Sequence, residues 1–262
     1  MASWSGKRRV KYIVGGLCII AGLVSIPIVS ILTKKPTCFD KAQNQDEEGV
    51  DCGGSCVAIC QAGAKDLVVD WARPFRVEEG TYDMGALIEN TNEKAGTKEA
   101  VYHFKMYDAD NLLIAERFGK TFVLPGGRWV IFEGNIKTGE RAPRHAFIEF
   151  SPDISWIRTD LLNLKAPDIG TINQVFSEVD GKPRLSTTLV NKSPSPVEHI
   201  EVIAVLSDAE GTAIGVSRTI VEKLEKYGTT DVVFTWREPF PVQPVKIDVI
   251  PRINYIASVG AQ

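Results

Sequence analysis

The first long hydrophobic segment lies near the start of the chain. Residues 12–33 are 22 consecutive residues without Asp, Glu, Lys, Arg or His. A helix of that length reaches about 33 Å at about 1.5 Å per residue, which exceeds a bilayer core of about 30 Å. The pattern predicts a transmembrane helix over 12–33 that contacts membrane lipid.

Charges around this segment predict its orientation. Lys7, Arg8, Arg9 and Lys11 precede it, whereas only Lys34 and Lys35 follow before acidic residues begin. The stronger basic flank normally stays in the cytoplasm. We therefore expect a cytoplasmic stub over 1–11 and an extracytoplasmic C-terminal part, in a single-pass protein of the cell membrane.

A cleaved signal peptide is the alternative for the same segment. The apolar run is longer than a typical signal core, and no A-x-A-like cleavage site ends it, so an uncleaved anchor is favoured. Small residues at 3-4-3 spacing could pack against another helix and allow homo- or hetero-oligomers. These helix-packing candidates are Gly15, Cys18, Gly22 and Ser25.

After the anchor the pattern changes from continuous to alternating. Val245, Ile247 and Val249 alternate with Lys246 and Asp248, as in a half-buried strand. In 200–207, by contrast, both alternating sets are partly apolar. Strands recur every 10–15 residues or so, and no long helical period follows the anchor.

The last 200 residues or so contain an internal repeat. Residues 104–111, 126–132 and 148–157 correspond in order to 204–211, 228–234 and 247–256. Asn90 corresponds in the same way to Asn191. A period of this length indicates duplicated domains, each the size of an immunoglobulin-like β-sandwich. We expect domain 1 over 65–157 and domain 2 over 158–262.

One block of the repeat also resembles a known family. Phe104-x-Met106-Tyr107-Asp108 resembles the core motif of the FxLYD-type domain, a bacterial β-sandwich module of extracytoplasmic proteins. The second copy departs from the motif, with Ala204 and Ser207 in place of the Phe and the Tyr. The resemblance implies a fold and a location, and a structural or interaction role without an activity.

Residues 36–64 form a different, cysteine-rich segment, called the collar below. About thirty residues cannot bury a useful apolar core, so they need cross-links or a metal. Outside the cytoplasm four cysteines favour two disulfides, and the spacing leaves all three connectivities open. Gly53 and Gly54 give the backbone freedom for a tight reversal. The cysteines are Cys38, Cys52, Cys56 and Cys60.

Two metals are alternatives for the collar. Zinc on four thiolates is disfavoured by the spacing and by an oxidising compartment. Calcium suits the hard oxygen donors of the same segment, although no EF-hand pattern is present. We expect either no cofactor or Ca²⁺. The candidate calcium ligands are Asp40, Asn44, Glu47 and Asp51.

The collar sequence resembles a short cysteine motif of bacterial surface and secreted proteins. The matching string is Cys38-x-Asp40…Asn44…Glu47…Val50-Asp51-Cys52-Gly53-Gly54-x-Cys56…Cys60. The motif usually has Gly after the first Asp, and this chain has Lys41 there. The resemblance implies a place beside membrane anchors or β-sandwiches and no enzymatic role.

Composition narrows the function further. The 262-residue chain carries a net charge of −3, which argues against a nucleic-acid partner. His103, His145 and His199 fall in different predicted strands, and no nucleophile or nucleotide-binding motif accompanies them. The paired acids of 108–110 and 208–210 occupy corresponding turns, where turn capping explains them.

These features together predict an all-β ectodomain of two tandem immunoglobulin-like β-sandwiches, with one transmembrane helix and a small disulfide-rich segment. We expect a non-catalytic structural or protein-binding ectodomain in cell-envelope or surface-appendage assembly or adhesion. One alternative is a subunit of a larger membrane complex (secretion, pilus or transporter accessory) held by its transmembrane helix. A second alternative is an accessory hydrolase.

Overall fold

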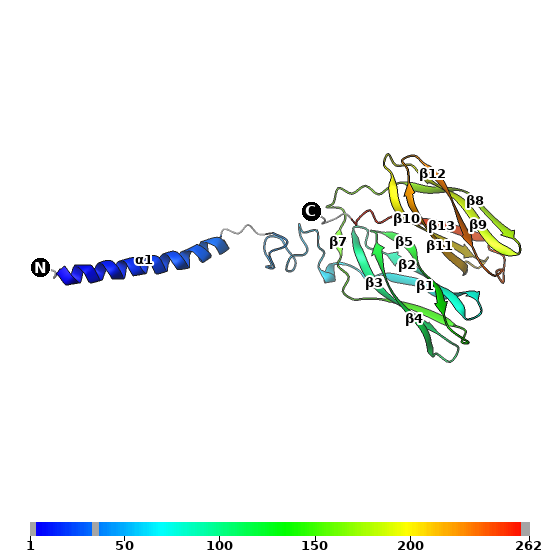
Figure 1. Ribbon diagram of the computed structural model, residues 1–262, viewed down its shortest axis with the longest axis horizontal. Helices are drawn as coiled ribbons and strands as arrows, with labels where there is room; N and C mark the ends of the chain where they lie inside the picture. Colours follow the sequence, from blue (N-terminus) through cyan, green and yellow to red (C-terminus); the bar gives the residue numbers. More distant parts are fainter. Residues whose placement is uncertain (1–3, 33–36, 258–262) are drawn as a thin grey trace.

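The computed structural model describes residues 4–32 and 37–257, with side chains described for 11–25 and 37–257. Helix α1 (Trp4–Leu32) stands away from a β-rich body, and the collar lies between them, as Figure 1 shows. The collar contains the short 3-10 helix η1 (Gln61–Gly63). Helix α1 covers the segment predicted to span the membrane, except Thr33, which lies outside the described residues. Within residues 4–32 and 37–257, no helix combines the length and the apolar character that crossing a bilayer requires.

The β-rich body consists of two units. The first β unit, residues 68–158, holds β1 (Val68–Glu78), β2 (Thr81–Asn90), β3 (Ala95–Tyr107), β4 (Leu113–Val123), β5 (Gly127–Lys137), β6 (His145–Phe150) and β7 (Ile157–Arg158). The second β unit, residues 169–252, holds β8 (Ile169–Val179), β9 (Lys182–Asn191), β10 (Val197–Ser207), β11 (Ala213–Leu224), β12 (Thr229–Thr235) and β13 (Lys246–Arg252). The mainly-β prediction is confirmed.

The two units have the same sheet topology. The first has sheets β1-β2-β5 and β4-β3-β6, with β7 paired to the start of β3. The second has sheets β8-β9-β12 and β11-β10-β13. The strands that the sequence repeat matches, β3 with β10, β5 with β12 and β6 with β13, occupy the same places in their units. The repeat in the sequence is therefore also a repeat in the topology.

Each unit has its own apolar core between its two sheets. In the first unit, Met84 and Ile88 of β2 face Phe104 and Met106 of β3, and all four are 0% exposed. The second unit repeats this arrangement with other side chains. The fully buried residues of this second core include Phe234, Leu185, Leu189, Ile200 and Leu206. Alternate residues of every central strand thus supply the cores, as the period of two requires.

A third core joins the two units. Phe75 and Val130, from the sheet β1-β2-β5, pack with Ile203, Val205 and Val216, from the sheet β11-β10-β13. Four sheets therefore lie one on another in the order β4-β3-β6, β1-β2-β5, β11-β10-β13 and β12-β9-β8, an arrangement that can be followed in Figure 1. The two inner sheets are covered on both faces.

This packing explains the unusual pattern of 200–207. Ile200, Val202, Ala204 and Leu206 face the core of their own unit, whereas Ile203 and Val205 face the first unit. Strands covered on both faces show nearly continuous apolar sequence rather than alternation. The two-sided pattern of β10 marks the strand at the joint.

Arg252 forms a polar bridge across the joint. Its side chain is buried between the units, where the guanidinium donates to the carbonyl of Phe122 at 2.7 Å and pairs with Glu201 at 3.0 Å. It also lies over the rings of Phe122 and Trp129, at 4.2 and 5.2 Å from their centroids. Burial lowers the pKa of Arg252 to about 10, so the group stays charged at neutral pH.

Two buried asparagines show that the duplication extends to side-chain roles. The amide of Asn90 donates to the carbonyls of Ala95 and Leu124, each at 2.8 Å. The amide of Asn191 donates in the same way to the carbonyls of Ser195 and Glu225, at 2.9 and 3.0 Å. Each asparagine therefore ties the end of its strand to the backbone of two neighbouring segments.

The first acid of each pair caps its turn, at equivalent places in the two units, as predicted. Asp108 accepts the N–H groups of Asp110 and Leu112, at 3.0 and 2.9 Å, and these bonds help to lower the pKa of Asp108. Asp208 accepts from Glu210 and Thr212 in the same pattern, at 3.1 and 2.7 Å. The third turn positions are Asn111 and Gly211, with φ of 59° and 78°, a region that these residue types tolerate best.

The joint between the units yields a stability prediction. Ile203→Ala removes a fully buried side chain from the third core, and we expect a loss of about 2–5 kcal/mol in the free energy of unfolding, measured by chemical denaturation. Ile220→Ala is the matched control, because Ile220 lies on neighbouring β11 and is 54% exposed. It should cost less than about 1 kcal/mol. Equal costs for the two variants would contradict a packed joint.

Candidate functional site

The collar is cross-linked by two disulfides. Cys38 bonds to Cys56 and Cys52 bonds to Cys60, with Cα–Cα distances of 5.6 and 5.0 Å. The predicted disulfide bonding is thus confirmed, and the structure selects one of the three connectivities that spacing leaves open. Cys18 is the free cysteine among the described residues.

Glycines make the reversal between the cysteines possible. Gly53 and Gly54 have φ of 79° and 55°, where side chains are strained. A Cβ on Gly54 would lie 2.1 Å from the carbonyl oxygen of Asp46. The Gly pair predicted to form a tight turn therefore also allows two segments of the collar to touch. Lys41, which replaces the usual Gly of the motif, has φ of 63° and adopts the backbone expected of that Gly.

The four side chains predicted to bind calcium form hydrogen bonds within the collar. The carboxylate of Asp51 accepts the N–H groups of Asp40 and Lys41, and the carboxylate of Asp40 accepts the side-chain amide of Asn44. Glu47 accepts the N–H of Asn44 at 3.0 Å. All four candidates thus lie in one hydrogen-bonded loop. Asn44 Oδ1 is buried without a hydrogen-bond partner in the described structure. Calcium binding stays a prediction.

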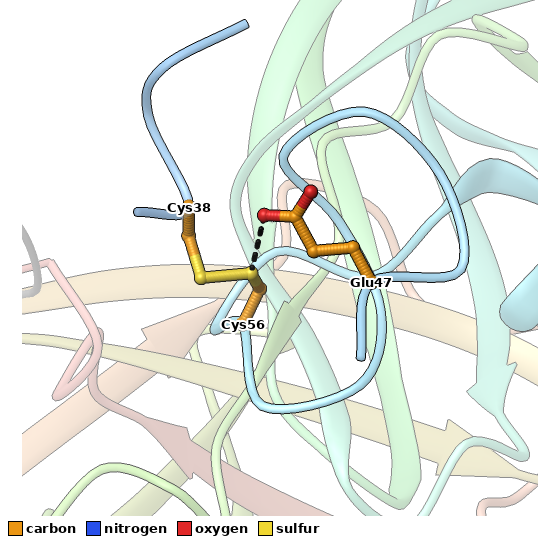
Figure 2. A group of neighbouring side chains, drawn as sticks. All are labelled: Cys38, Glu47 and Cys56. Carbon is orange, nitrogen blue, oxygen red and sulfur yellow. Dashed lines mark hydrogen bonds between the residues drawn. A yellow bond between two sulfur atoms is a disulfide. The ribbon is translucent and has the colours of Figure 1, made fainter. Parts of the chain in front are cut away.

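Glu47 lies against one of the disulfides, as Figure 2 shows. One of its carboxylate oxygens is 3.4 Å from Cys56 Sγ, and the side chain is buried. Cys38, Glu47 and Cys56 are the one group with metal-ligand spacing found within the described residues. Both sulfurs belong to the same disulfide, so they lack the thiolate charge that a zinc site requires.

The collar is attached to the first β unit rather than free of it. The backbone N–H of Ile59 donates to Trp156 and that of Arg158 donates to Val57, at 3.0 and 2.7 Å. The side chain of Arg158 also donates to the carbonyl of Gly54 at 2.8 Å. The side chain of Ile59 packs against the core of the first unit. These contacts make the collar an extension of the first β unit.

The three histidines lie apart from one another in the described part of the chain. His103 lies on the outer face of β3, stacked on Phe118 and 2.9 Å from Glu116, and His199 lies 3.3 Å from Glu222 on β10 and β11. His145 begins β6. The histidines therefore lie on different strands, as the sequence predicts. Their placement does not test whether the protein is an enzyme.

The predicted helix-packing residues lie on α1. Cys18 is exposed, and an added Cβ at Gly15 or Gly22 would meet no atom within 4 Å. The hydroxyl of Ser25 donates to the carbonyl of Gly22 within the helix. The structure does not test whether another helix packs here.

A groove of about 1090 Å³ lies between the two β units. Most of its lining comes from β1, β6, β11 and the segment between β12 and β13, and a few residues come from β2 and β5. That segment contains Pro239 and Pro241, which cannot donate to a strand and keep it out of the sheets. The groove is a product of the packing between units, so no single motif could reveal it.

Salt bridges connect the two walls of the groove. Arg237 of the second unit lies 2.6 Å from Glu78 of the first, and this hydrogen bond lowers the pKa of Glu78. A second salt bridge joins Arg76 of the first unit to Glu238 of the second unit, at 3.5 Å. Burial raises the pKa of Asp83, another lining residue, whose carboxylate accepts the N–H of Asn135. Charge is thus concentrated where the units meet.

Comparisons with known proteins add little to this geometry. No protein-family model matches the chain, and no curated protein matches it. Among solved structures the chain is similar to a red sea bream transglutaminase, at 11% sequence identity and a TM-score of 0.22. The match covers 73% of this chain and 30% of that chain. A similarity at this score carries no inference about function.

The collar geometry gives a second prediction. Gly54→Ala adds both backbone strain and a contact with Asp46, so we expect about 2 kcal/mol less local stability. Dithiothreitol should then reduce the collar disulfides about thirtyfold faster than in the wild type. The reduction rate is measured by alkylating the freed thiols and detecting them by mass spectrometry. Gly139→Ala is the control: its φ is also positive at 64°, but an added Cβ there meets no atom within 4 Å. Reduction of the control should proceed at the wild-type rate. Equal rates in all three proteins would contradict a tightly packed collar.

Proposed function

We propose that this protein is a membrane-anchored, extracytoplasmic ectodomain with a non-catalytic structural or protein-binding role. Its place would be in envelope or surface-appendage assembly or adhesion. The observation that carries the proposal is the third core, which joins the two β units into one block with a groove at its side. A block of this kind can hold a binding surface at a fixed orientation.

The immunoglobulin-like assignment has structural support. Each unit encloses a core between two antiparallel sheets, and both units share one topology. Phe104 and Met106, from the motif that resembles FxLYD domains, are 0% exposed in the first core. A sequence motif that marks a fold is expected to supply side chains to the core of that fold. We therefore propose two tandem FxLYD-type β-sandwiches.

The disulfides support an extracytoplasmic location. Reducing conditions in the cytoplasm disfavour structural disulfides, whereas oxidising compartments preserve them. The collar of this chain carries two disulfides and little apolar core, so its fold depends on them. Helix α1 precedes the collar, and its basic N-terminal flank would remain inside the cell.

A larger membrane complex is the second candidate. The small residues of α1, Gly15 and Gly22 together with the exposed Cys18, leave room for a close helix neighbour. In that case α1 would hold the protein in the complex, and the β units would act as its external part.

The location is tested by protease treatment of intact cells that produce the full chain with a C-terminal tag. We expect the tag to be lost from intact cells while a cytoplasmic marker protein survives. The five cysteines supply a second measurement. Without reduction, only Cys18 should be alkylated in the purified native chain.

A Cys18→Ser variant is the control, and it should show no alkylation before reduction. A tag protected until lysis, together with alkylated collar cysteines, would refute the extracytoplasmic location.

A further inference from the structure

The groove between the two β units carries charge opposite to that of the whole protein. Its lining includes five arginines, one histidine and two acidic residues, whereas the chain as a whole carries a net charge of −3. A concentration of positive charge in a hollow attracts anionic groups over a distance of several ångströms. The lining arginines are Arg73, Arg76, Arg144, Arg218 and Arg237.

Two of these arginines carry charge that the described protein does not neutralise. Arg76 and Arg237 pair across the groove with Glu238 and Glu78, and Arg218 lies 3.4 Å from Glu201. No salt bridge of the described residues involves Arg73 or Arg144. These two guanidiniums are therefore available to carboxylates of a ligand, with which they form strong paired hydrogen bonds.

The walls of the groove also offer backbone groups. Strands β1, β6 and β11 each lie at the edge of their sheet and pair on one side only, among the strands that the structure describes. Residues 72–77, 143–147 and 213–218, from these strands and the approach to β6, line the groove. An edge strand has unpaired N–H and C=O groups, which an extended peptide can use by adding a strand. In β11 the carbonyl of Val216 already accepts the indole N–H of Trp236 at 3.3 Å, so that carbonyl is not open to a peptide.

Aromatic side chains give the groove an apolar part. Phe147 is 55% exposed, and the rings of Trp236 and Phe240 lie 5.3 Å apart in the wall formed by the second unit. Successive side chains of an extended peptide point to opposite sides. A peptide that alternates acidic and apolar residues would therefore present carboxylates to the arginines and apolar side chains to these rings.

We propose that this groove binds an extended, acidic segment of a protein partner. The inference rests on the proposed protein-binding function and names the site and the chemistry of the partner. Edge strands favour a peptide over an anionic polysaccharide, which lacks the backbone amides needed to extend a sheet. The volume of about 1090 Å³ lies at the upper end for small-ligand pockets and suits a chain segment.

Fluorescence anisotropy with the full-length protein in detergent tests the proposal. The probe is a labelled peptide of alternating Glu and Val, about ten residues long, which is the length of a long strand. We expect it to bind, and the corresponding Gln and Val peptide to bind at least about tenfold more weakly, because the groove is cationic.

Paired variants locate the binding. Arg73→Gln with Arg144→Gln removes the two unneutralised charges, and we expect at least about tenfold weaker binding of the Glu and Val peptide. The matched control is Arg117→Gln with Arg184→Gln, which removes two exposed arginines, one from each unit, that lie outside the groove. The control should bind as the wild type does. Thermal unfolding of both double variants shows that they are folded.

A backbone-modified probe separates strand addition from simple charge attraction. The same Glu and Val peptide with alternate amides N-methylated should bind at least about tenfold more weakly, because it cannot complete the hydrogen bonds of a new strand. Equal binding of the methylated probe, with displacement by soluble polygalacturonate, would overturn the peptide proposal in favour of a polyanion site. Unchanged binding in the Arg73 and Arg144 double variant would overturn the groove as the site.

The outcome is distinguishable from a failure of the proposed function. If protease treatment and alkylation place the β units outside the cell, and the Arg73 and Arg144 variant still binds the probe fully, the groove proposal fails alone. If the tag is protected in intact cells, the proposed location fails whatever the anisotropy shows.

Discussion

The arrangement of the β units depends on the packing of sheet β1-β2-β5 against sheet β11-β10-β13. Ile203 and Val205 project from β10 toward the first unit, where Val130 and Phe75 meet them. Left exposed, these side chains would form an apolar patch on the second unit. Their burial fixes the two units in one block, and Arg252 adds polar contacts at the edge of the same surface.

Comparison of the two copies shows how a duplicated unit acquired this joint. Ile203 and Val205 of β10 correspond to His103 and Lys105 of β3, which lie on the outer face of the first unit. In the repeat of β2, Ser186 and Thr188 take the places of Gly85 and Leu87. At these positions the apolar side chains of β2 and β10 lie on the two faces that meet at the joint, whereas the matching residues of β3 and β9 are polar.

The collar and the groove both depend on which surfaces of the first unit are covered by other parts of the chain. Arg158 and Ile59 attach the collar near one end of the unit, and two disulfides stiffen it. Because the joint covers the face of sheet β1-β2-β5 and leaves its β1 edge uncovered, the edges of β1, β6 and β11 surround a hollow. The placement of charge in that hollow is what distinguishes it from an ordinary gap between domains.

The sequence by itself determined the β-rich class, the repeat, the capped turns at Asp108 and Asp208 and the presence of disulfides, because each depends on local spacing and residue chemistry. It showed that 200–207 is apolar on both faces but not what covers the second face. The tertiary structure decided the disulfide pairing, the joint, the docking of the collar and the cationic groove. These features bring together residues far apart in the chain, such as Arg73 and Arg144 or Arg252 and Phe122. Their proximity depends on how sheets stack, which spacing along the chain does not encode.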